Sequence, residues 1–478
     1  MKLIFDVSDK PKAGQLVVFA LQQMLAILAA TIAVPLIIGN GLTPAAAMFG
    51  AGVGTIVYIL FTKRKSPVFL GSSFAFLGSM AAAFAGGVSM QLGMLGLIIG
   101  ALLAGLVYVV IAIVVKFVGV GWLNKLMPAV VIGPTVAIIG LSLAGNAIGD
   151  LLKGDVTKQV TDYVVSTDSG TPEIIETVSN VPVGSSYVAL VCGLITLAVV
   201  MLCSAYGKKT LKLIPFIIGI LAGYAAAAIF TVIGNICDID ALKIVDLSVF
   251  SSYMLTDGST SLKTFVSLPD FSFVSGLEGL KEFDFSYFAT IFVAYVPVAL
   301  VVFAEHVADH KNLSSIIDHD LLEEPGLTRT LLGDGVGSIA GALFGGCPNT
   351  TYGESVACVA ITGNASVITI FAAAIGCMLF SFITPLVAFV DSIPACVMGG
   401  VCIALYGFIA VSGLKMIQDV NLDDNRNLFV VSVILIAGIG GLTLTFGDIT
   451  LTEVAAALIL GILTNVMLSK KKGNADKK

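Results

Sequence analysis

Long runs of apolar residues, separated by short polar stretches, dominate the chain. A helix needs about 20 predominantly apolar residues to cross a bilayer. Runs of about this length occupy residues 14–39, 42–62, 90–119, 125–146, 187–205, 211–236, 287–310, 365–390, 395–415, 428–447 and 450–469. Three further apolar stretches are interrupted by glycine, proline or hydroxyl residues, at 70–86, 329–346 and 347–363. The pattern predicts about fourteen membrane elements.

The composition supports this interpretation. Of the 478 residues, 57% are hydrophobic and only 12% are charged, whereas a soluble protein carries roughly 25% charged residues. Too few polar groups remain to cover a surface that faces water. A soluble enzyme, a disordered protein and a secreted disulfide scaffold are therefore excluded, and we expect an all-α polytopic protein whose main partner is the lipid bilayer.

The positions of the basic residues predict the orientation. Short loops rich in lysine and arginine stay in the cytoplasm. With the N-terminus inside, the basic residues of the short loops and of the tail fall on the cytoplasmic side: Lys63, Arg64, Lys65, Lys116, Lys125, Lys208, Lys209, Lys212 and Lys470 to Lys472. The two longer polar loops then lie outside, and the first, between Gly149 and Ser186, holds six acids and two lysines. We expect a multi-pass protein of the cell membrane with both termini cytoplasmic and outer loops that hold a small hairpin or short helices.

Several functions lack support in the sequence. The chain has no basic patch with interleaved aromatic residues, so we expect no nucleic-acid partner. Its eight cysteines include no CxxC pair, which makes a metal or redox role improbable. The spans contain no nucleophile–base pair and no metal-ligand spacing, so we expect no enzyme activity, no metal site and no cofactor.

Two of the interrupted segments resemble each other. The first, Leu70 to Gly78, contains a Ser-Ser-Phe string that ends at Phe74, and the second, Cys347 to Ser355, contains a Thr-Thr-Tyr string that ends at Tyr352. Non-helical backbone at membrane depth is tolerated only where it is buried in protein or lines a cavity. A matching pair of such segments in two halves of a chain indicates a transporter's binding site. The alternative is a pair of glycine-rich helix-packing faces.

Acidic residues inside the apolar runs are the candidate functional groups, because an acid in the bilayer costs at least about 2.5 kcal/mol. Glu305 and Asp309 end a long apolar run, and their i, i+4 spacing places both on one helix face. Two acids on one face repel each other, so at least one is expected to be protonated or paired. His306 points elsewhere on the same helix, and Glu354 follows the second interrupted segment directly.

Less specific interpretations remain open for several of these residues. Phe74 and Phe76 either stack on a ligand or face lipid, and Tyr406 either serves a neighbouring acid or fills the interior. Asp309, His310 and Lys311 are alternatively a solvated helix end. Four further acids are better interpreted as residues at the ends of spans: Asp334, Asp391, Asp448 and Glu453.

The side chains suit a particular ligand. Two carboxylates that face Ser, Thr and Tyr hydroxyls form a poor site for an anion but a good one for a neutral, flat, N–H-rich molecule, because a carboxylate accepts two N–H bonds. The backbone at Gly353 can approach such a ligand closely. Burial disfavours the charged form of a carboxylate, which would couple the ligand to proton movement.

Over nearly all of its length except the two outer loops, the chain resembles the nucleobase–ascorbate transporter family, and most closely its bacterial uracil permease branch. The residues that carry the resemblance form six strings: Gly71 to Phe76, Ala304 to Val307, Pro325 to Leu327, Pro348 to Glu354, Val397 to Val401 and Leu405 to Gly407.

The resemblance implies a fold of about fourteen transmembrane segments in two inverted repeats of seven, divided into a core and a gate domain. The third and tenth segments would each be a short strand plus a helix. The implied boundaries are a cytoplasmic N-terminus (1–13), core segments and the first gate segment (14–146), an extracellular loop (147–186), gate segments (187–236), a second extracellular loop (237–286), core segments (287–390), gate segments (391–469) and a cytoplasmic tail (470–478).

The resemblance also implies roles for individual residues. Proton-coupled uptake of a nucleobase would proceed with the gate domain moving against the core and with the proton as coupling ion. Substrate binding would fall to Glu305 and Glu354, the backbone of Phe74 and Gly353, and the nearby Ala30 and Tyr352, and proton coupling to Glu305, Asp309 and Tyr406.

Two departures from the family pattern bear on the substrate. Asp309 stands where the uracil branch usually has a histidine, and an acid there is more similar to purine-transporting relatives. Ser355 and Ala357 replace the expected Asn and Gly after the second glutamate, whereas Thr362 is retained. Uracil is the favoured substrate, with xanthine or another purine second. An anion transporter or channel of the same inverted-repeat architecture is the alternative of a different class, and homodimer formation is left open.

Overall fold

The computed structural model describes residues 3–119, 128–166, 173–208, 210–254, 259–446 and 449–468. Lys125, Lys209, Asp448 and the predicted tail 470–478 lie outside these residues. The chain forms two compact units. The first comprises Met1–Leu143, Phe265–Val387 and Leu405–Lys478, and the second comprises Ala144–Thr264 and Ala388–Ala404.

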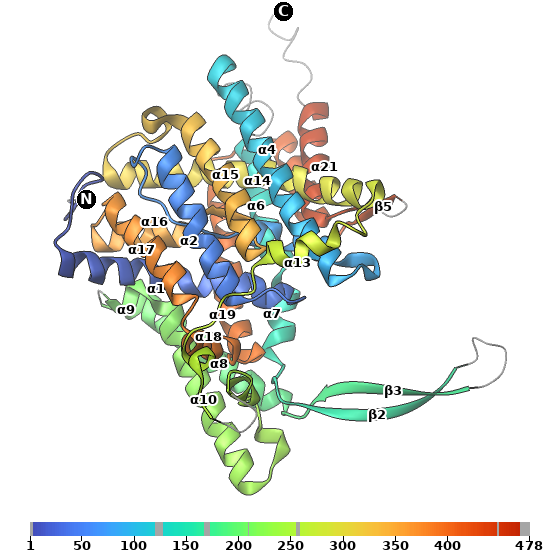
Figure 1. Ribbon diagram of the computed structural model, residues 1–478. Helices are drawn as coiled ribbons and strands as arrows, with labels where there is room; N and C mark the ends of the chain where they lie inside the picture. Colours follow the sequence, from blue (N-terminus) through green and yellow to red (C-terminus); the bar gives the residue numbers. More distant parts are fainter. Residues whose placement is uncertain are drawn as a thin grey trace, which may run out of the picture. The chain divides into compact units, whose positions relative to one another are not determined.

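The first unit holds most of the apolar helices (Figure 1). They are α1 (Ala13–Ile38), α2 (Pro44–Phe61), α3 (Leu77–Ala83), α4 (Met90–Val118), α6 (Ala129–Ser142), α13 (Ser272–Gly279), α14 (Phe285–Ile317), α15 (Leu327–Gly345), α16 (Gly353–Thr362), α17 (Val367–Phe380), α20 (Asn425–Ile439) and α21 (Glu453–Leu468). α19 (Ala395–Met416) runs through both units. Side chains cap several helix starts, such as Asp284 Oδ1, which accepts the Tyr287 N–H at the start of α14.

Within the described part of the chain, eight helices are long and apolar enough to cross a membrane, and shorter apolar helices accompany them. The chain is therefore a multi-pass membrane protein. Two expected runs differ from the structure. Residues 365–390 are divided between α17 and α18 (Thr384–Asp391), and the helix of 428–447 ends at Ile439.

A third difference is that residues 329–346, expected to be interrupted, form the continuous helix α15. Its glycines face α2 at close range: a Cβ at Gly337 would lie 2.8 Å from the carbonyl oxygen of Gly54, and one at Gly345 would lie 2.8 Å from that of Ala46. Small residues let the backbones of two membrane helices approach each other. The glycines of α15 therefore serve helix packing and do not break the helix.

The other two interrupted segments each form a short strand followed by helical residues, as expected. β1 (Leu70–Ser72) pairs antiparallel with β4 (Asn349–Thr351), with Leu70 opposite Thr351. The pairing continues past both strand ends, because Ser73 N–H donates to the Pro348 carbonyl at 2.9 Å and Tyr352 N–H donates to the Phe69 carbonyl at 3.2 Å. Both strands are fully buried. Each strand thus provides the hydrogen bonds that the other needs away from water.

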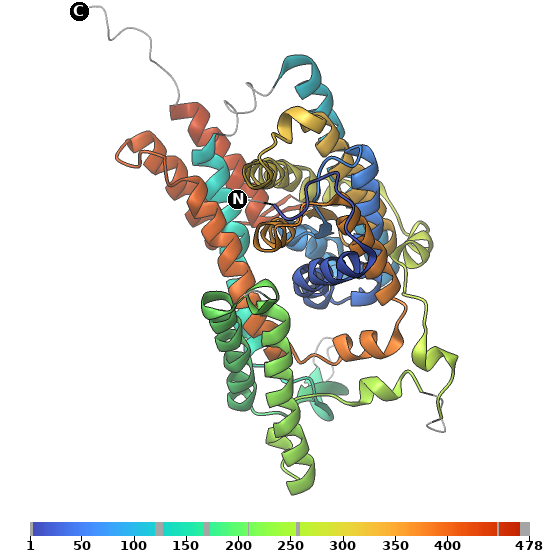
Figure 2. The same cartoon turned by 90° about the vertical axis from the view of Figure 1, so that its left-hand side faces the viewer.

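The second unit contains α7 (Ala144–Leu151), α8 (Ser186–Tyr206), α10 (Pro215–Cys237) and the antiparallel hairpin of β2 (Thr157–Ser166) and β3 (Glu173–Pro182). α8 and α10 lie side by side in both views (Figure 1 and Figure 2), and Gly223 of α10 leaves room for Thr196 of α8. The hairpin falls in the first expected outer loop, and short helical turns such as Asp240–Leu242 and Ser248–Ser251 fall in the second.

Candidate functional site

A small cavity lies in the first unit where the strand pair meets α14 and α16. The lining residues come from six elements and the turns between them: Phe74, Ala75, Ile139, Glu305, Thr350, Thr351, Tyr352, Gly353, Glu354, Leu405 and Ile409. Its volume is about 50 Å³, which holds a water molecule or two. Ligand pockets usually measure about 300–1,000 Å³, so a ring-shaped ligand enters only if the lining elements move apart.

The strand pair positions the residues that follow each strand. Tyr352 Oη donates a 2.7 Å hydrogen bond to the Ser72 carbonyl, which ties the end of β4 to β1. α16 begins at Gly353, immediately beyond this contact, so that Glu354 stands in the first helical turn. The partial positive charge of a helix N-terminus favours a carboxylate there. The local fold therefore places an acid at the cavity, in the first turn of a helix.

Ser355, one of the departures from the family pattern, fixes α16 from the other side. Its hydroxyl accepts hydrogen bonds from the Gln23 side chain of α1 and from the Phe69 N–H, the latter at 3.0 Å. Both Gln23 and Ser355 are buried. The helix that carries Glu354 is thus attached to α1 and to the residue that precedes β1.

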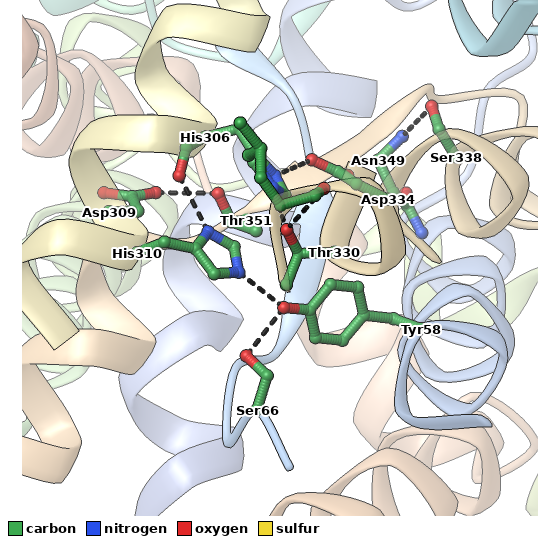
Figure 3. A network of polar contacts seen from close by, with 11 residues as sticks. Tyr58, Ser66, His306, Asp309, His310, Thr330, Asp334, Ser338, Asn349 and Thr351 are labelled. Atoms are coloured by element: carbon green, nitrogen blue, oxygen red, sulfur yellow. Dashed lines mark hydrogen bonds and ion pairs between the residues drawn. The ribbon is translucent and has the colours of Figure 1, made fainter. Parts of the chain in front are cut away.

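α14 supplies the second glutamate, Glu305, and Asp309 one turn later. Asp309 Oδ2 accepts a 2.8 Å hydrogen bond from the Thr351 hydroxyl of β4 (Figure 3). Asp309 Oδ1 lies 4.0 Å from the place where a Cβ on Gly353 would stand. The solvated-helix-end interpretation is therefore wrong for Asp309, which adjoins the cavity, and holds for Lys311, which is exposed.

The structure brings most of the predicted binding residues together. Glu305 and Glu354 both line the cavity and retain some accessible surface, and Phe74, Tyr352 and Gly353 line it with them. In the part of the chain that the structure describes, no lysine, arginine or histidine forms an ion pair with either glutamate. Their carboxylate oxygens are therefore available to accept hydrogen bonds from a ligand.

Besides Asp309, two predicted residues lie outside the lining. Ala30 is 1% exposed in α1 and is not one of the residues around the cavity. Tyr406 of α19 is buried, and its ring packs against that of Phe74 in a T-shaped arrangement, with the centroids 5.9 Å apart. Tyr406 therefore packs behind Phe74, which lines the cavity.

A fully buried pair of ionisable residues lies behind the cavity and was not expected. His306 Nδ1 is 2.7 Å from Asp334 Oδ2, and His306 Nε2 is 3.0 Å from the Thr330 hydroxyl (Figure 3). His306 and Asp334 are both 0% exposed. The interpretation of Asp334 as a residue at the end of a span is therefore wrong. The prediction that His306 points away from Glu305 is confirmed, and Asp334 is the partner that it meets.

A second polar contact follows one turn later on α14. His310 Nδ1 is 2.7 Å from the His306 carbonyl oxygen, and His310 Nε2 is 2.6 Å from Tyr58 Oη of α2. Tyr58 Oη is in turn 2.7 Å from Ser66 Oγ. The solvated-helix-end interpretation is wrong for His310, which is 0% exposed. Nothing in the sequence pattern around Tyr58 indicates this contact, because the two residues are far apart in the chain.

No group of three or more His, Cys, Asp or Glu residues within the described ranges could hold a metal ion. The polar groups around the cavity can donate and accept hydrogen bonds.

Apolar membrane helices around a small polar cavity at two broken, crossing segments define a multi-pass membrane transport protein. The chain belongs to the permease family, whose family model matches residues 14–181 and 171–446.

Relatives of nearly equal length support the assignment. The chain is 36% identical to the uracil permease of Bacillus caldolyticus over 99% of its own length and 97% of the relative's. It is 34% identical to the uracil permease of Bacillus subtilis (strain 168), over 98% and 96% of the two lengths. With the uracil permease of Escherichia coli (strain K12) the identity is 32%, over 95% and 92%.

Solved structures resemble the chain in fold alone. The transmembrane domain of a cyanobacterium bicarbonate transporter, BicA, aligns with a TM-score of 0.58 at 13% identity, over 96% of this chain and 100% of that one. The murine Solute Carrier 26 family member A9 anion transporter, in the inward-facing state, aligns with a TM-score of 0.59 at 12% identity, over 96% and 69%.

Proposed function

We propose that this protein takes up a nucleobase, with uracil favoured, across the cell membrane together with a proton. The observation that carries the proposal is that Glu305 and Glu354 line one cavity, within the described residues, without a basic partner. The uracil permeases among the relatives support the same substrate class. An anion site would need positive charge or helix N-termini without acids, so the two glutamates argue against the anion alternative.

The geometry suits a flat ring with alternating N–H and C=O groups on its edge. The carboxylate of Glu354 can accept N–H bonds from such a ring. The first N–H groups of α16, beginning at Gly353, have no partner inside the helix and can donate to a ring carbonyl. Phe74 adds an aromatic side chain to the cavity wall. Uracil, which presents both kinds of group on one edge, matches this set.

The proton is assigned to the acids of α14. Glu305 and Asp309 are one helical turn apart, where two negative charges repel each other. A proton held by either carboxyl removes that repulsion, and the hydrogen bond from Thr351 keeps the Asp309 carboxylate beside the cavity. Tyr406 would act through Phe74, against which its ring packs. A ligand that excludes water from this place strengthens the repulsion between two charged acids, so its binding favours the state in which one of them holds a proton. The movements of substrate and proton are then coupled.

Alternating access would open the cavity in turn to each side of the membrane. The small volume of the cavity supports a closed state that has to open before a ring enters. The core and gate boundaries expected from the sequence supply the moving parts in this proposal: core segments mainly in 14–146 and 287–390, and gate segments in 187–236 and 391–469. Both termini would face the cytoplasm.

A binding and uptake panel on the purified protein in proteoliposomes tests the proposal. We expect uptake of labelled uracil that rises when the outside is made more acidic, and competition by unlabelled uracil that exceeds competition by xanthine, hypoxanthine or ascorbate. Uptake of xanthine without uptake of uracil would overturn the uracil assignment in favour of a purine. Thermal shifts with bicarbonate or sulfate and none with any nucleobase would overturn the whole proposal.

A further inference from the structure

A row of buried polar groups leads from α14 away from the cavity, and the proposed binding chemistry does not use it. His310 Nε2 lies 2.6 Å from Tyr58 Oη, and Tyr58 Oη lies 2.7 Å from Ser66 Oγ (Figure 3). All three residues are 0% exposed. Burying three polar side chains costs free energy unless they bond to one another, and here they form an uninterrupted row of hydrogen bonds.

The chemistry of the partners fixes where the hydrogens lie. The His306 carbonyl can only accept, so His310 Nδ1 carries a hydrogen and donates to it at 2.7 Å. In a neutral imidazole the other nitrogen, Nε2, then accepts. Tyr58 therefore donates to His310, and the oxygen of Tyr58 accepts from Ser66. Both O–H bonds point from Ser66 towards His310.

We propose that Ser66, Tyr58 and His310 form a proton wire that exchanges a proton between α14 and the solution at the loop between α2 and β1. A proton that binds Ser66 Oγ displaces the serine hydrogen to Tyr58 Oη, and the tyrosine hydrogen passes to His310 Nε2. Each oxygen keeps one hydrogen, and His310 becomes a doubly protonated cation. The same steps in reverse return the proton to solution.

The outer end of the wire is close to solvent. Ser66 directly follows Lys63, Arg64 and Lys65, all of which are exposed, whereas Ser66 itself is buried. The proton therefore passes between an exposed loop and a buried helix through two hydroxyl groups. In the orientation that the basic residues predict, this loop faces the cytoplasm, which is where uptake has to release its proton.

The inner end of the wire acts on the site through charge. The titratable groups around His310 are His306 and Asp309 on its own helix, Tyr58 on α2 and Asp334 of α15, which bonds to His306. The rings of His306 and His310 have their centroids 4.0 Å apart. A positive His310 favours the ionised form of nearby acids, so a proton that the wire brings to His310 weakens the hold of Asp309 on its own proton, and the return of the wire's proton to solution restores that hold. This inference rests on the proposed proton-coupled function.

A tyrosine pair in the first unit provides a matched test. Tyr58→Phe removes the central hydroxyl of the wire and keeps the ring. Tyr295→Phe is the control, because Tyr295 is also 0% exposed and its hydroxyl has no hydrogen-bond partner among the described residues. Each variant in proteoliposomes is assayed in two ways: uracil exchange at equal pH on both sides, and uracil uptake driven by a pH gradient with a proton-sensitive dye inside.

Exchange needs no release of the proton, whereas gradient-driven uptake does. We expect Tyr58→Phe to keep uracil exchange and to lose gradient-driven uptake and proton flux by about 100-fold, as for other groups that transfer a proton. Tyr295→Phe should keep both activities. Ser66→Ala interrupts the wire at the end nearest the loop between α2 and β1. Like Tyr58→Phe, it should keep uracil exchange and lose gradient-driven uptake.

The alternative outcomes are distinguishable. Normal proton flux in Tyr58→Phe would overturn the wire, and so would a parallel loss of exchange and uptake, which indicates a purely structural role. A wild-type protein that exchanges uracil and moves no proton would overturn proton coupling and the wire together but leave the substrate assignment intact. A wild-type protein that binds no uracil would overturn the proposed function itself.

Discussion

The ring of Tyr352 lies directly against Gly71, so the residue that follows one crossing strand occupies the space that a side chain on the other strand would fill. A Cβ at Gly71 would overlap the ring carbons of Tyr352. The Tyr352 hydroxyl then reaches the carbonyl of Ser72, the residue next to Gly71, at 2.7 Å. Two segments that are far apart in the sequence are thereby held in one register beside the cavity.

Gly71→Ala should destabilise the protein and impair uracil binding, because the methyl group forces the strands apart. Overpacking of this kind costs about 1–3 kcal/mol. Thermal unfolding in detergent and uracil titration measure the two effects. Gly407→Ala in α19 is the control, since a Cβ there meets nothing within 4 Å and alanine favours a helix. A Gly71→Ala protein that unfolds and binds like the wild type would contradict the proposed packing.

Glu354→Gln should abolish uracil binding, because the amide places a donor where the ligand also has a donor. The lost charge-assisted bond is worth about 1.5–3 kcal/mol, which corresponds to roughly a 10- to 100-fold weaker Kd even before donor–donor repulsion. Glu305→Gln should weaken binding as well. Titration calorimetry checks both variants, with the exposed Glu323→Gln as control. Normal binding in both Glu305→Gln and Glu354→Gln would mean that the site lies elsewhere.

Gly353→Ala should weaken the binding of uracil without reducing the stability of the fold. A Cβ there meets only Asp309 Oδ1 at 4.0 Å, so we expect an unchanged unfolding temperature. The same methyl group enters the cavity, where one extra carbon reduces affinity by roughly 10-fold or more. Parallel measurements of unfolding temperature and uracil Kd test this. Unchanged affinity would show that the ligand does not approach the start of α16.

Asp309→Asn should reduce the pH dependence of uptake more than the affinity for uracil. The amide oxygen still accepts the Thr351 hydrogen bond, so the shape of the site is kept, but the group no longer binds a proton. Initial uptake rates between roughly pH 5 and 8, where such linkage appears, are compared with those of the wild type. An unaltered pH profile would exclude Asp309 from proton coupling.

Asp155, in the first of the two loops expected to lie outside, should make the stability of the protein depend on pH. Burial raises the pKa of its carboxyl from 3.8 to about 6, against the opposing effect of the Ala395 N–H that it binds. The folded state therefore binds more protons than the unfolded state between these values, so stability increases as the pH falls from above 6 towards 4.

Asp155→Asn keeps an oxygen for the Ala395 N–H and removes the charge. We expect the variant to be more stable than the wild type at pH 7, by at most about 2–3 kcal/mol, with the difference disappearing near pH 4. Unfolding temperatures at several pH values measure it. A wild-type profile with the opposite slope would contradict the raised pKa.

The sequence pattern predicted the two broken segments, and the family resemblance implied their strands, but the pattern misinterpreted α15 for a physical reason. Both β1 and β4 contain hydroxyl residues in apolar surroundings, which is a local signal. The glycines of α15 also suggested an interruption, because glycine weakens a helix in water. Here Gly337 and Gly345 instead allow the backbone of α15 to approach α2. Only the neighbouring helix distinguishes a packing glycine from a breaking one, and a local pattern does not contain that helix.

The same limit applies to the site. The apolar run before Glu305 and the broken segment before Glu354 identified both acids from local pattern alone. Asp334 was misinterpreted because its partner His306 lies on another helix, and no spacing rule relates residues on two separate helices. Tyr58 was missed for the same reason. Long-range polar pairs become visible only when the helices that carry them are placed side by side.

The pairing of β1 with β4 also has a consequence for how the chain is made. At roughly 5–20 residues per second, the ribosome completes β1 on the order of tens of seconds before Asn349 to Thr351 exist. Until then, the peptide groups of Leu70 to Ser72 lack the partners they have in the finished protein. The first half of the chain is thus inserted into the membrane while the backbone N–H and C=O groups of β1 are still unpaired. Either water or the insertion machinery has to shield these peptide groups until residues 349–351 have been synthesised.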